Sequence, residues 1–314
     1  MEELKKEAVI ELNDITMDFG GKRVLDKVNL TVNKGDIYGF VGENGAGKTT
    51  VMRILTGLIK QTAGTYKILG ASWDSKKIYD ARSKVGAIIE TPAIYTNFNA
   101  YDNLKLALIL AGKKPDKNKI EQTLKNVGLE AEIKSKKKAG NFSLGMRQRL
   151  GIAMAAVDEA ELLILDEPIN GLDPTGIVEI RNLILDLHSK GVTVFISSHI
   201  LSELSMIATR YGIISHGKMV REFEASEIEK LGQKTTSIKT TDNQKAFEAI
   251  KEAVGADNCS LNENSIDVYG EFNLNSIIKN LAMIDVEIED ITKHNESLED
   301  VYLKQIDSNN GGEE

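Results

Sequence analysis

The sequence predicts an α/β fold with a parallel sheet, followed by a smaller C-terminal α+β domain. Short apolar strands alternate with a helix over residues 161–220, a glycine-rich loop follows a buried strand near residue 42, and the pattern changes after residue 222. Strand–helix–strand order favours parallel pairing, because the helix supplies the crossover between the strands. The length of 314 residues is about twice that of a typical domain, so two domains are expected.

Six segments of the first half have patterns that predict a strand or a helix. Residues 28–32 alternate as in a half-buried strand, and residues 36–41 are apolar on both faces, as in a central strand. Helices are expected where apolar residues repeat every three or four positions. The expected strands are 8–12, 28–32 and 36–41, and the expected helices are 49–58, 104–110 and 120–129. The lysine-rich segment 134–140 is expected to be a solvated loop.

The second half of the sequence predicts a strand–helix–strand unit with parallel strands, followed by a smaller domain with another order of elements. Strands 162–165 and 192–196 flank a helix at 176–189, and a polar helical connector follows at 224–234. Beyond it the order is β-α-β-β-α-β, a split βαβ arrangement. Its expected elements are strand 237–241, helix 244–254, a hairpin near 262–264, helix 273–284 and strand 286–291. The predicted domains are 7–222, with a helical subdomain at about 91–155, and 223–306, with a disordered tail at 307–314.

The composition excludes several classes of protein. Lysine and arginine number 39 against 47 acidic residues, a net charge of −8, so no nucleic-acid partner is expected. The single cysteine, Cys259, excludes an intrachain disulfide and a multi-cysteine zinc site. No apolar run approaches the roughly 18–20 residues that cross a bilayer, and the first residues do not resemble a signal peptide. We therefore expect a cytoplasmic chain whose membrane part, if it has one, comes from a partner.

The loop from Gly42 to Thr49 matches G-x-x-x-x-G-K-S/T, the phosphate-binding P-loop. Glycines let backbone N–H groups surround phosphate oxygens, and the helix that follows directs its positive dipole end toward them. Lys48 is expected to neutralise the β- and γ-phosphates, and the Thr49 hydroxyl to bind Mg²⁺. The segment predicts a triphosphate site.

Two carboxylates end the apolar strand Leu162–Leu165. The carboxyl ends of parallel strands meet at one edge of the sheet, so Asp166 and Glu167 should lie beside the P-loop. Asp166 is expected to hold Mg²⁺, directly or through water. Glu167 is expected to polarise the attacking water as a general base.

Residues 141–149, NFSLGMRQR, lie between these two motifs. They resemble the signature motif of ATP-binding cassette (ABC) ATPases, usually LSGGQ, although Ser143 also fits a simple helix N-cap. Ser143 and Gly145 match the motif, whereas Leu144 and Met146 replace its first glycine and its glutamine. The resemblance covers residues 7–222 and implies the P-loop NTPase core of an ABC ATPase.

The resemblance also implies ligands and roles for other residues. Phe19 stands where an adenine-stacking aromatic lies, His199 where a switch histidine touches the γ-phosphate, and Asp173 in the loop that links two ATP sites. Glu90 replaces the glutamine of the loop that joins the core to the helical subdomain. The implied ligands are ATP and Mg²⁺, with Mg²⁺ held by Thr49, Asp166 and Glu90. The implied ATP-binding residues are Phe19, Gly42, Glu43, Asn44, Gly45, Ala46, Gly47, Lys48, Thr49, Thr50, Ser143 and Gly145.

The implied mechanism involves two kinds of partner. A second ATPase subunit, identical or different, would sandwich two ATP molecules with this one, and Ser143 would face the ATP of that second subunit. Glu90 and the helical region would press on a separate transmembrane permease. The chain would then couple ATP hydrolysis to transport from the inner face of the cell membrane.

Two features resemble a subgroup of ABC ATPases that protect cells against lantibiotics or bacitracin. They are Glu90 and the run 165–177. The C-terminal segment 296–303 resembles the ending of many ABC exporter ATPases that have separate membrane subunits, although it also fits a closing amphipathic helix. The resemblance implies an exporter of peptide antibiotics. The alternatives are a soluble ABC ATPase that acts on ribosomes or nucleic acid, an exporter ATPase for an unrelated substrate, and an inactive regulatory cassette. Leu144 and Met146 suggest the last, but the retained Glu167 and His199 argue against it.

Overall fold

The computed structural model describes residues 7–227, 235–255, 258–262, 264–270 and 272–294. The chain divides into two compact units, of which the first ends at Glu224 and the second begins at Ala225. Part of the expected connector (228–234), the C-terminal segment 296–303 and the tail 307–314 lie outside the described residues. In the described part of the chain, no helix is long and apolar enough to cross a membrane.

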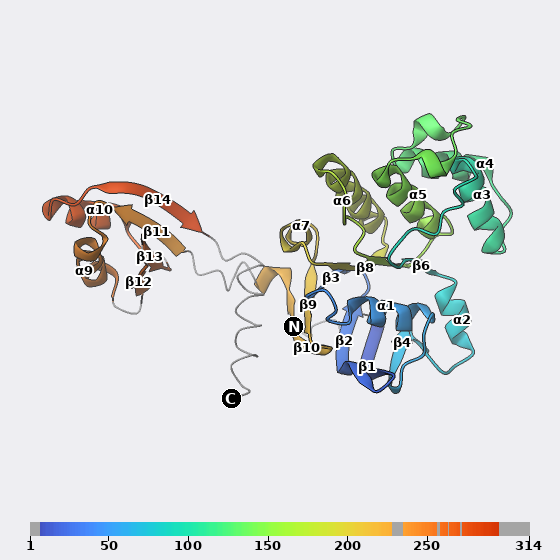
Figure 1. Ribbon diagram of the computed structural model, residues 1–314, viewed down its shortest axis with the longest axis horizontal. Coiled ribbons are helices and arrows are strands. Elements are labelled where there is room, and N and C mark those ends of the chain that lie inside the picture. Colours follow the sequence, from blue (N-terminus) through green and yellow to red (C-terminus); the bar gives the residue numbers. More distant parts are fainter. Residues whose placement is uncertain (1–6, 228–234, 256–257, 263, 271, 295–314) are drawn as a thin grey trace. The chain divides into compact units, whose positions relative to one another are not determined.

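A six-stranded sheet forms the centre of the first unit, in the order β10-β9-β3-β8-β7-β6 (Figure 1). Its strands are parallel except β10, which pairs antiparallel with β9. The strands are β3 (Ile37–Val41), β6 (Val85–Ile88), β7 (Leu162–Asp166), β8 (Thr193–Ser198), β9 (Arg210–Ser215) and β10 (Lys218–Glu224). Every residue of β3, β7 and β8 is buried, as expected for a parallel sheet covered on both faces. The predicted parallel sheet is confirmed.

A second sheet, antiparallel with the order β2-β1-β4-β5, belongs to the same unit. Its strands are β1 (Ala8–Phe19), β2 (Lys22–Asn33), β4 (Ala63–Ile68) and β5 (Ala71–Ser72). β1 and β2 are longer than the expected strands 8–12 and 28–32. Shifts in their pairing register, such as the one between Leu12 and Ile15, break the alternation on which the prediction relied.

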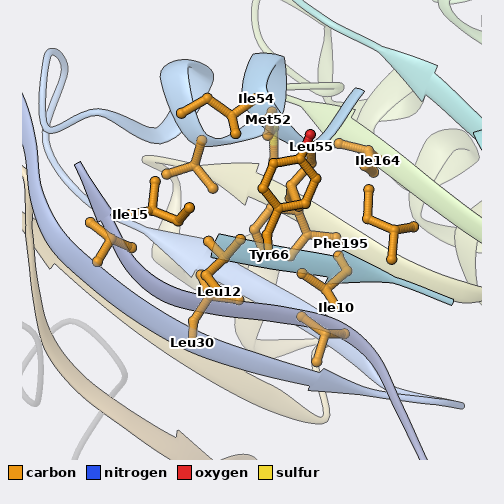
Figure 2. Packing of buried hydrophobic residues seen from close by; sticks show 14 of the residues in the cluster. Ile10, Leu12, Ile15, Leu30, Met52, Ile54, Leu55, Tyr66, Ile164 and Phe195 are labelled. Carbon is orange, nitrogen blue, oxygen red and sulfur yellow. The ribbon is translucent and has the colours of Figure 1, made fainter. Parts of the chain in front are cut away.

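The main core lies between the two sheets and includes α1 (Lys48–Thr56). Figure 2 shows side chains of β1, α1 and the parallel sheet pointing toward one another. Among those fully buried are Ile10, Ile15, Met52, Ile54, Leu55, Ile164 and Phe195. This packing holds α1, and with it the end of the P-loop, firmly against the parallel sheet.

The other helices of the unit begin at side-chain caps in four cases. Asn99, Asp116, Ser143 and Asp173 each accept a hydrogen bond from a backbone N–H of the first helical turn, which satisfies a group that has no partner within the helix. The caps place three helix starts earlier than periodicity indicated, at residues 100, 117 and 174. The capped helices are α3 (Ala100–Leu110), α4 (Lys117–Asn126), α5 (Leu144–Ala156) and α6 (Pro174–Ser189), and the remaining two are α2 (Lys77–Arg82) and α7 (Leu201–Ser205).

The second unit has the predicted β-α-β-β-α-β order. Its elements are β11 (Thr235–Thr240), α9 (Asn243–Val254), β12 (Cys259–Leu261), β13 (Ile266–Tyr269), α10 (Leu274–Met283) and β14 (Ile288–His294). The four strands form an antiparallel sheet in the order β12-β13-β11-β14. Both helices place apolar residues, such as Ile250 and Leu281, in a separate small core with Ile238 and Ile266.

Candidate functional site

The P-loop runs from the end of β3 to the start of α1. Gly42 is required there, because a Cβ atom at this position would lie 2.3 Å from the Ile214 carbonyl oxygen. Gly47 has a φ of 109° and precedes α1, whose start is capped by no side chain of the described residues. The first N–H groups of a helix have no intrahelical acceptor. They are therefore available to an anion at the positive end of α1.

A cavity of about 230 Å³ opens at this loop. Its lining residues are Val24, Glu43, Asn44, Gly45, Gly47, Lys48, Thr49, Thr50 and Glu167. Lys48 is 6% exposed, and its ammonium donates hydrogen bonds to the carbonyl oxygens of Gly42 (2.5 Å) and Glu43 (3.2 Å). A buried cation among free N–H groups makes the cavity suitable for a polyphosphate.

Asp166 ends β7 beside this cavity and is almost fully buried. Its Oδ2 atom accepts a hydrogen bond from the Thr49 hydroxyl (2.9 Å), and its Oδ1 atom accepts one from the Ser197 hydroxyl (2.7 Å). Thr49 and Asp166 offer the hard oxygen atoms that Mg²⁺ prefers. The described residues contain no group of three or more acidic, histidine or cysteine side chains for a metal.

Glu167 follows Asp166 and turns its side chain into the cavity. Its φ of 47° is left-handed, a conformation that non-glycine residues adopt only where the surroundings enforce it. Its Oε2 atom lies 2.7 Å from His199 Nδ1, and its Oε1 atom lies 3.5 Å from Lys48 Nζ. Within the described structure, Oε1 is buried and has no hydrogen-bond partner. The P-loop, Asp166, Glu167 and His199, predicted separately from the sequence, therefore meet at one sheet edge.

Residues 25–170 match the family described as ABC transporter. The bacitracin transport ATP-binding protein BcrA of Enterococcus faecalis is 41% identical over 302 residues, which are 96% of this chain and 97% of BcrA. The chain belongs to the ABC transporter ATP-binding family. The lantibiotic transport ATP-binding protein SrtF of Streptococcus pyogenes is 42% identical over 221 residues, covering 70% of this chain and 93% of SrtF. A solved ATP-binding subunit of an ABC transporter has 26% identity and a TM-score of 0.63, covering 71% of this chain and 92% of its own.

As an ABC ATPase, the chain binds and hydrolyses ATP. Phe19 and Glu90 are among the predicted ABC site residues that lie outside the lining of the cavity. Phe19 ends β1, opposite Lys22 of β2, and is 45% exposed. Glu90 follows β6 with a left-handed φ of 64°, and its carboxylate forms an ion pair with Arg53 of α1. Adenine stacking by Phe19 and metal binding by Glu90 stay predictions.

The residues of the ABC signature motif lie at the start of α5. The Ser143 hydroxyl accepts a hydrogen bond from the Met146 N–H (3.2 Å), which confirms the N-cap that the sequence suggested. A Cβ atom on Gly145 would lie 3.9 Å from Leu172 Cδ2, so the signature motif lies beside the loop that ends at Asp173. Ser143, Gly145 and Asp173 are outside the lining of this chain's cavity. That position agrees with a role toward the ATP of a second subunit, and this role stays a prediction.

The structure adds residues to the site of this ABC ATPase that the sequence did not indicate. Val24 of β2 lines the cavity, and Ser197 of β8 contacts both Asp166 and Glu167. The N–H of Gly217, in the turn between β9 and β10, donates to the Ala46 carbonyl oxygen (3.1 Å), while the Gly217 carbonyl accepts from the Asp26 N–H (2.8 Å). Ser197 precedes His199 by two residues, and this proximity to a predicted site residue could have indicated it. No motif in the sequence indicates Val24 or Gly217 as site residues.

Proposed function

We propose that the chain is the energy-coupling subunit of an exporter for a peptide antibiotic of the bacitracin or lantibiotic class. The observation that carries this proposal is the 41% identity with a bacitracin transport ATP-binding protein over 302 residues. That similarity includes the second compact unit, whereas the solved ABC structure covers 71% of the chain. A similarity of this extent favours a transport function shared with BcrA, in addition to the ATPase chemistry that all ABC cores have in common.

The geometry of the site supports a different role for each of its residues in ATP binding and hydrolysis. Lys48 and the first N–H groups of α1 would bind the phosphates of ATP. Thr49 and Asp166 would hold Mg²⁺, which neutralises phosphate charge when bound. Glu167 would accept a proton from the attacking water, because its Oε1 atom is buried without a hydrogen-bond partner among the described residues. His199 would orient the Glu167 carboxylate and contact the γ-phosphate.

Two partners complete the proposed assembly. A second ATPase subunit, identical or different, would receive the exposed Ser143 end of α5 against its ATP. A separate transmembrane permease would contact Glu90 and the helical region, which would place the chain at the inner face of the cell membrane. Phe19 would stack on adenine, since its ring is exposed at the end of β1.

The proposal is tested in cells. The gene would be expressed with the membrane proteins encoded beside it in a strain sensitive to bacitracin and to a lantibiotic. We expect the inhibitory concentration of one class to rise with the wild-type chain but not with Glu167→Gln. An antibiotic with an intracellular target serves as the control. No rise for either peptide class would reject the proposed substrate, and an equal rise with Glu167→Gln would show sequestration instead of transport.

A further inference from the structure

We infer that Ser197 is a positioning residue for ATP hydrolysis, which orients the Asp166 carboxylate and fixes the backbone of Glu167 with one hydroxyl group. Ser197 lies opposite Asp166 in the parallel pairing of β7 with β8. Its side chain is fully buried, so water cannot replace its contacts. The inference rests on the roles proposed above for Asp166 and Glu167.

The hydrogen bonds of Ser197 have one consistent direction. Its hydroxyl donates to Asp166 Oδ1 (2.7 Å) and accepts from the Glu167 N–H (3.0 Å). A serine hydroxyl has a single proton, a carboxylate only accepts and an N–H only donates, so no other arrangement satisfies both contacts. The hydroxyl therefore links the two acidic residues that end β7.

The contact with Asp166 determines how its carboxylate faces the P-loop. The Oδ2 atom receives the Thr49 hydroxyl (2.9 Å), so each carboxylate oxygen has one hydroxyl partner and rotation about the last side-chain bond is restricted. Groups that orient a metal ligand in this way commonly change metal affinity or activity by about 10–100-fold when they are removed. Ser197 is thus placed to tune Mg²⁺ binding without touching the ion.

The contact with Glu167 acts on the backbone. Glu167 has a left-handed φ of 47°, which costs energy for a residue with a side chain and persists only where its surroundings hold it. The Ser197 hydroxyl holds the N–H of this residue. The carboxylate of Glu167 is thereby directed toward His199 and Lys48. Loss of the hydroxyl should loosen the metal ligand and the general base together.

The next residue provides a matched control. Ser198 lies in the same strand and is equally buried, but its hydroxyl accepts a hydrogen bond from the Ile200 N–H (2.9 Å). Ser198→Ala removes the same oxygen atom one position away. A general effect of cutting a hydroxyl from β8 would appear in both variants, whereas an effect on positioning would appear only in Ser197→Ala.

The experiment compares the full-length wild type with Ser197→Ala, Ser197→Thr, Ser198→Ala and Asp166→Asn. Binding of a fluorescent ATP analogue is measured in EDTA and then as Mg²⁺ is added, and thermal unfolding checks folding. We expect Ser197→Ala to bind the analogue in EDTA as the wild type does, but to need about 10–100-fold more Mg²⁺ for the half-maximal Mg²⁺-dependent change. Its kcat should fall, Ser197→Thr should restore both properties, and Ser198→Ala should behave as the wild type.

Two results would overturn the inference. One is a Mg²⁺ dependence of Ser197→Ala equal to that of the wild type or of Ser198→Ala, while Asp166→Asn changes it. The other is a failure of Ser197→Thr to restore a defect seen in a folded Ser197→Ala. If Asp166→Asn leaves the Mg²⁺ dependence unchanged, the proposed metal role of Asp166 is wrong instead. If Ser197→Ala does not fold, the isosteric pair Ser197→Thr and Ser197→Val gives the same comparison.

Discussion

The Nδ1 atom of His199 lies 2.7 Å from the Oε2 atom of Glu167, so the imidazole holds this carboxylate at the mouth of the phosphate cavity. The other carboxylate oxygen faces the ammonium of Lys48 at 3.5 Å. Both partners of Glu167 are groups that a phosphate anion also attracts. We therefore expect the phosphates of ATP to compete with Glu167 for Lys48, which would free the Oε1 atom to accept a proton from water while His199 still orients the carboxylate.

Replacement of Glu167 by glutamine tests the proposed base. Glu167→Gln keeps the shape of the side chain but cannot take up a proton, so turnover should fall by about 100-fold or more. ATP should still bind, and gel filtration with Mg-ATP should show a stable dimer for this variant only. Glu161→Gln, which changes an exposed acid just before β7, is the control. Hydrolysis by Glu167→Gln at the wild-type rate would contradict the role of Glu167.

Removal of the Lys48 side chain should weaken nucleotide binding. The ammonium is the buried positive charge of the P-loop, and a charge-assisted contact contributes about 1.5–3 kcal/mol. We expect the ATP affinity of Lys48→Ala, measured by calorimetry, to fall by an order of magnitude or more. Lys84→Ala removes an exposed lysine that pairs with Glu161 and should leave the affinity unchanged. Equal affinities for the two variants would exclude the assigned role of the P-loop lysine.

Glu90 is expected to act in coupling rather than in folding. Its ion pair with Arg53 is exposed, so Glu90→Gln should change the free energy of unfolding by less than about 1 kcal/mol. ATP affinity should stay nearly intact because the two side chains are isosteric. Cells that carry Glu90→Gln should lose part of their resistance, although the isolated subunit still hydrolyses ATP.

The matched variant for Glu90 is Glu90→Ala, which removes the polar group altogether. Resistance should decrease in both variants if the negative charge matters. If cells with Glu90→Gln keep full resistance while cells with Glu90→Ala lose it, then glutamate and glutamine are equivalent here. Arg53→Gln, measured in parallel, shows whether breaking the ion pair from its other side has the same effect.

The raised pKa values of two buried tyrosines predict that the folded protein loses stability at alkaline pH. Burial raises the pKa of Tyr38 well above its usual range, helped by Glu222, to which its hydroxyl donates a hydrogen bond (2.7 Å). Burial also raises the pKa of Tyr211 to about 12. Above about pH 10 the unfolded chain releases these protons while the folded chain keeps them, so the free energy of unfolding falls by about 1.4 kcal/mol per pH unit for each tyrosine.

Urea unfolding at roughly pH 8 and pH 11 measures this slope. Tyr38→Phe has no proton to lose at this position, so its stability should fall less steeply with pH than that of the wild type. Tyr79→Phe, which alters an exposed tyrosine, should keep the wild-type slope. The same slope in Tyr38→Phe as in the wild type would mean that Tyr38 does not cause the alkaline loss.

The sequence predicted those parts of the site that depend on local pattern. Lys48, Asp166 and the Ser143 cap each belong to a short motif whose neighbours define a strand or a helix. Ser197 was not predicted although it lies two residues before His199, because its contact with Asp166 depends on the register between β7 and β8, which the sequence does not state. The pair Arg53–Glu90 joins the end of α1 to a loop 37 positions away, so it became visible only when both were packed together.

The turn between β9 and β10 limits where this subunit can be modified. His216 and Lys218 are exposed there, and by exposure alone the turn would be a natural place for an epitope tag or a fluorescent label. Gly217 has a φ of 76°, however, and a Cβ atom on it would lie 2.3 Å from the Val24 carbonyl oxygen. Since its backbone also holds Ala46, an insertion at this turn would displace the P-loop. Residues 112–115, exposed before α4, offer a safer attachment point, with Lys114 as the residue to derivatise.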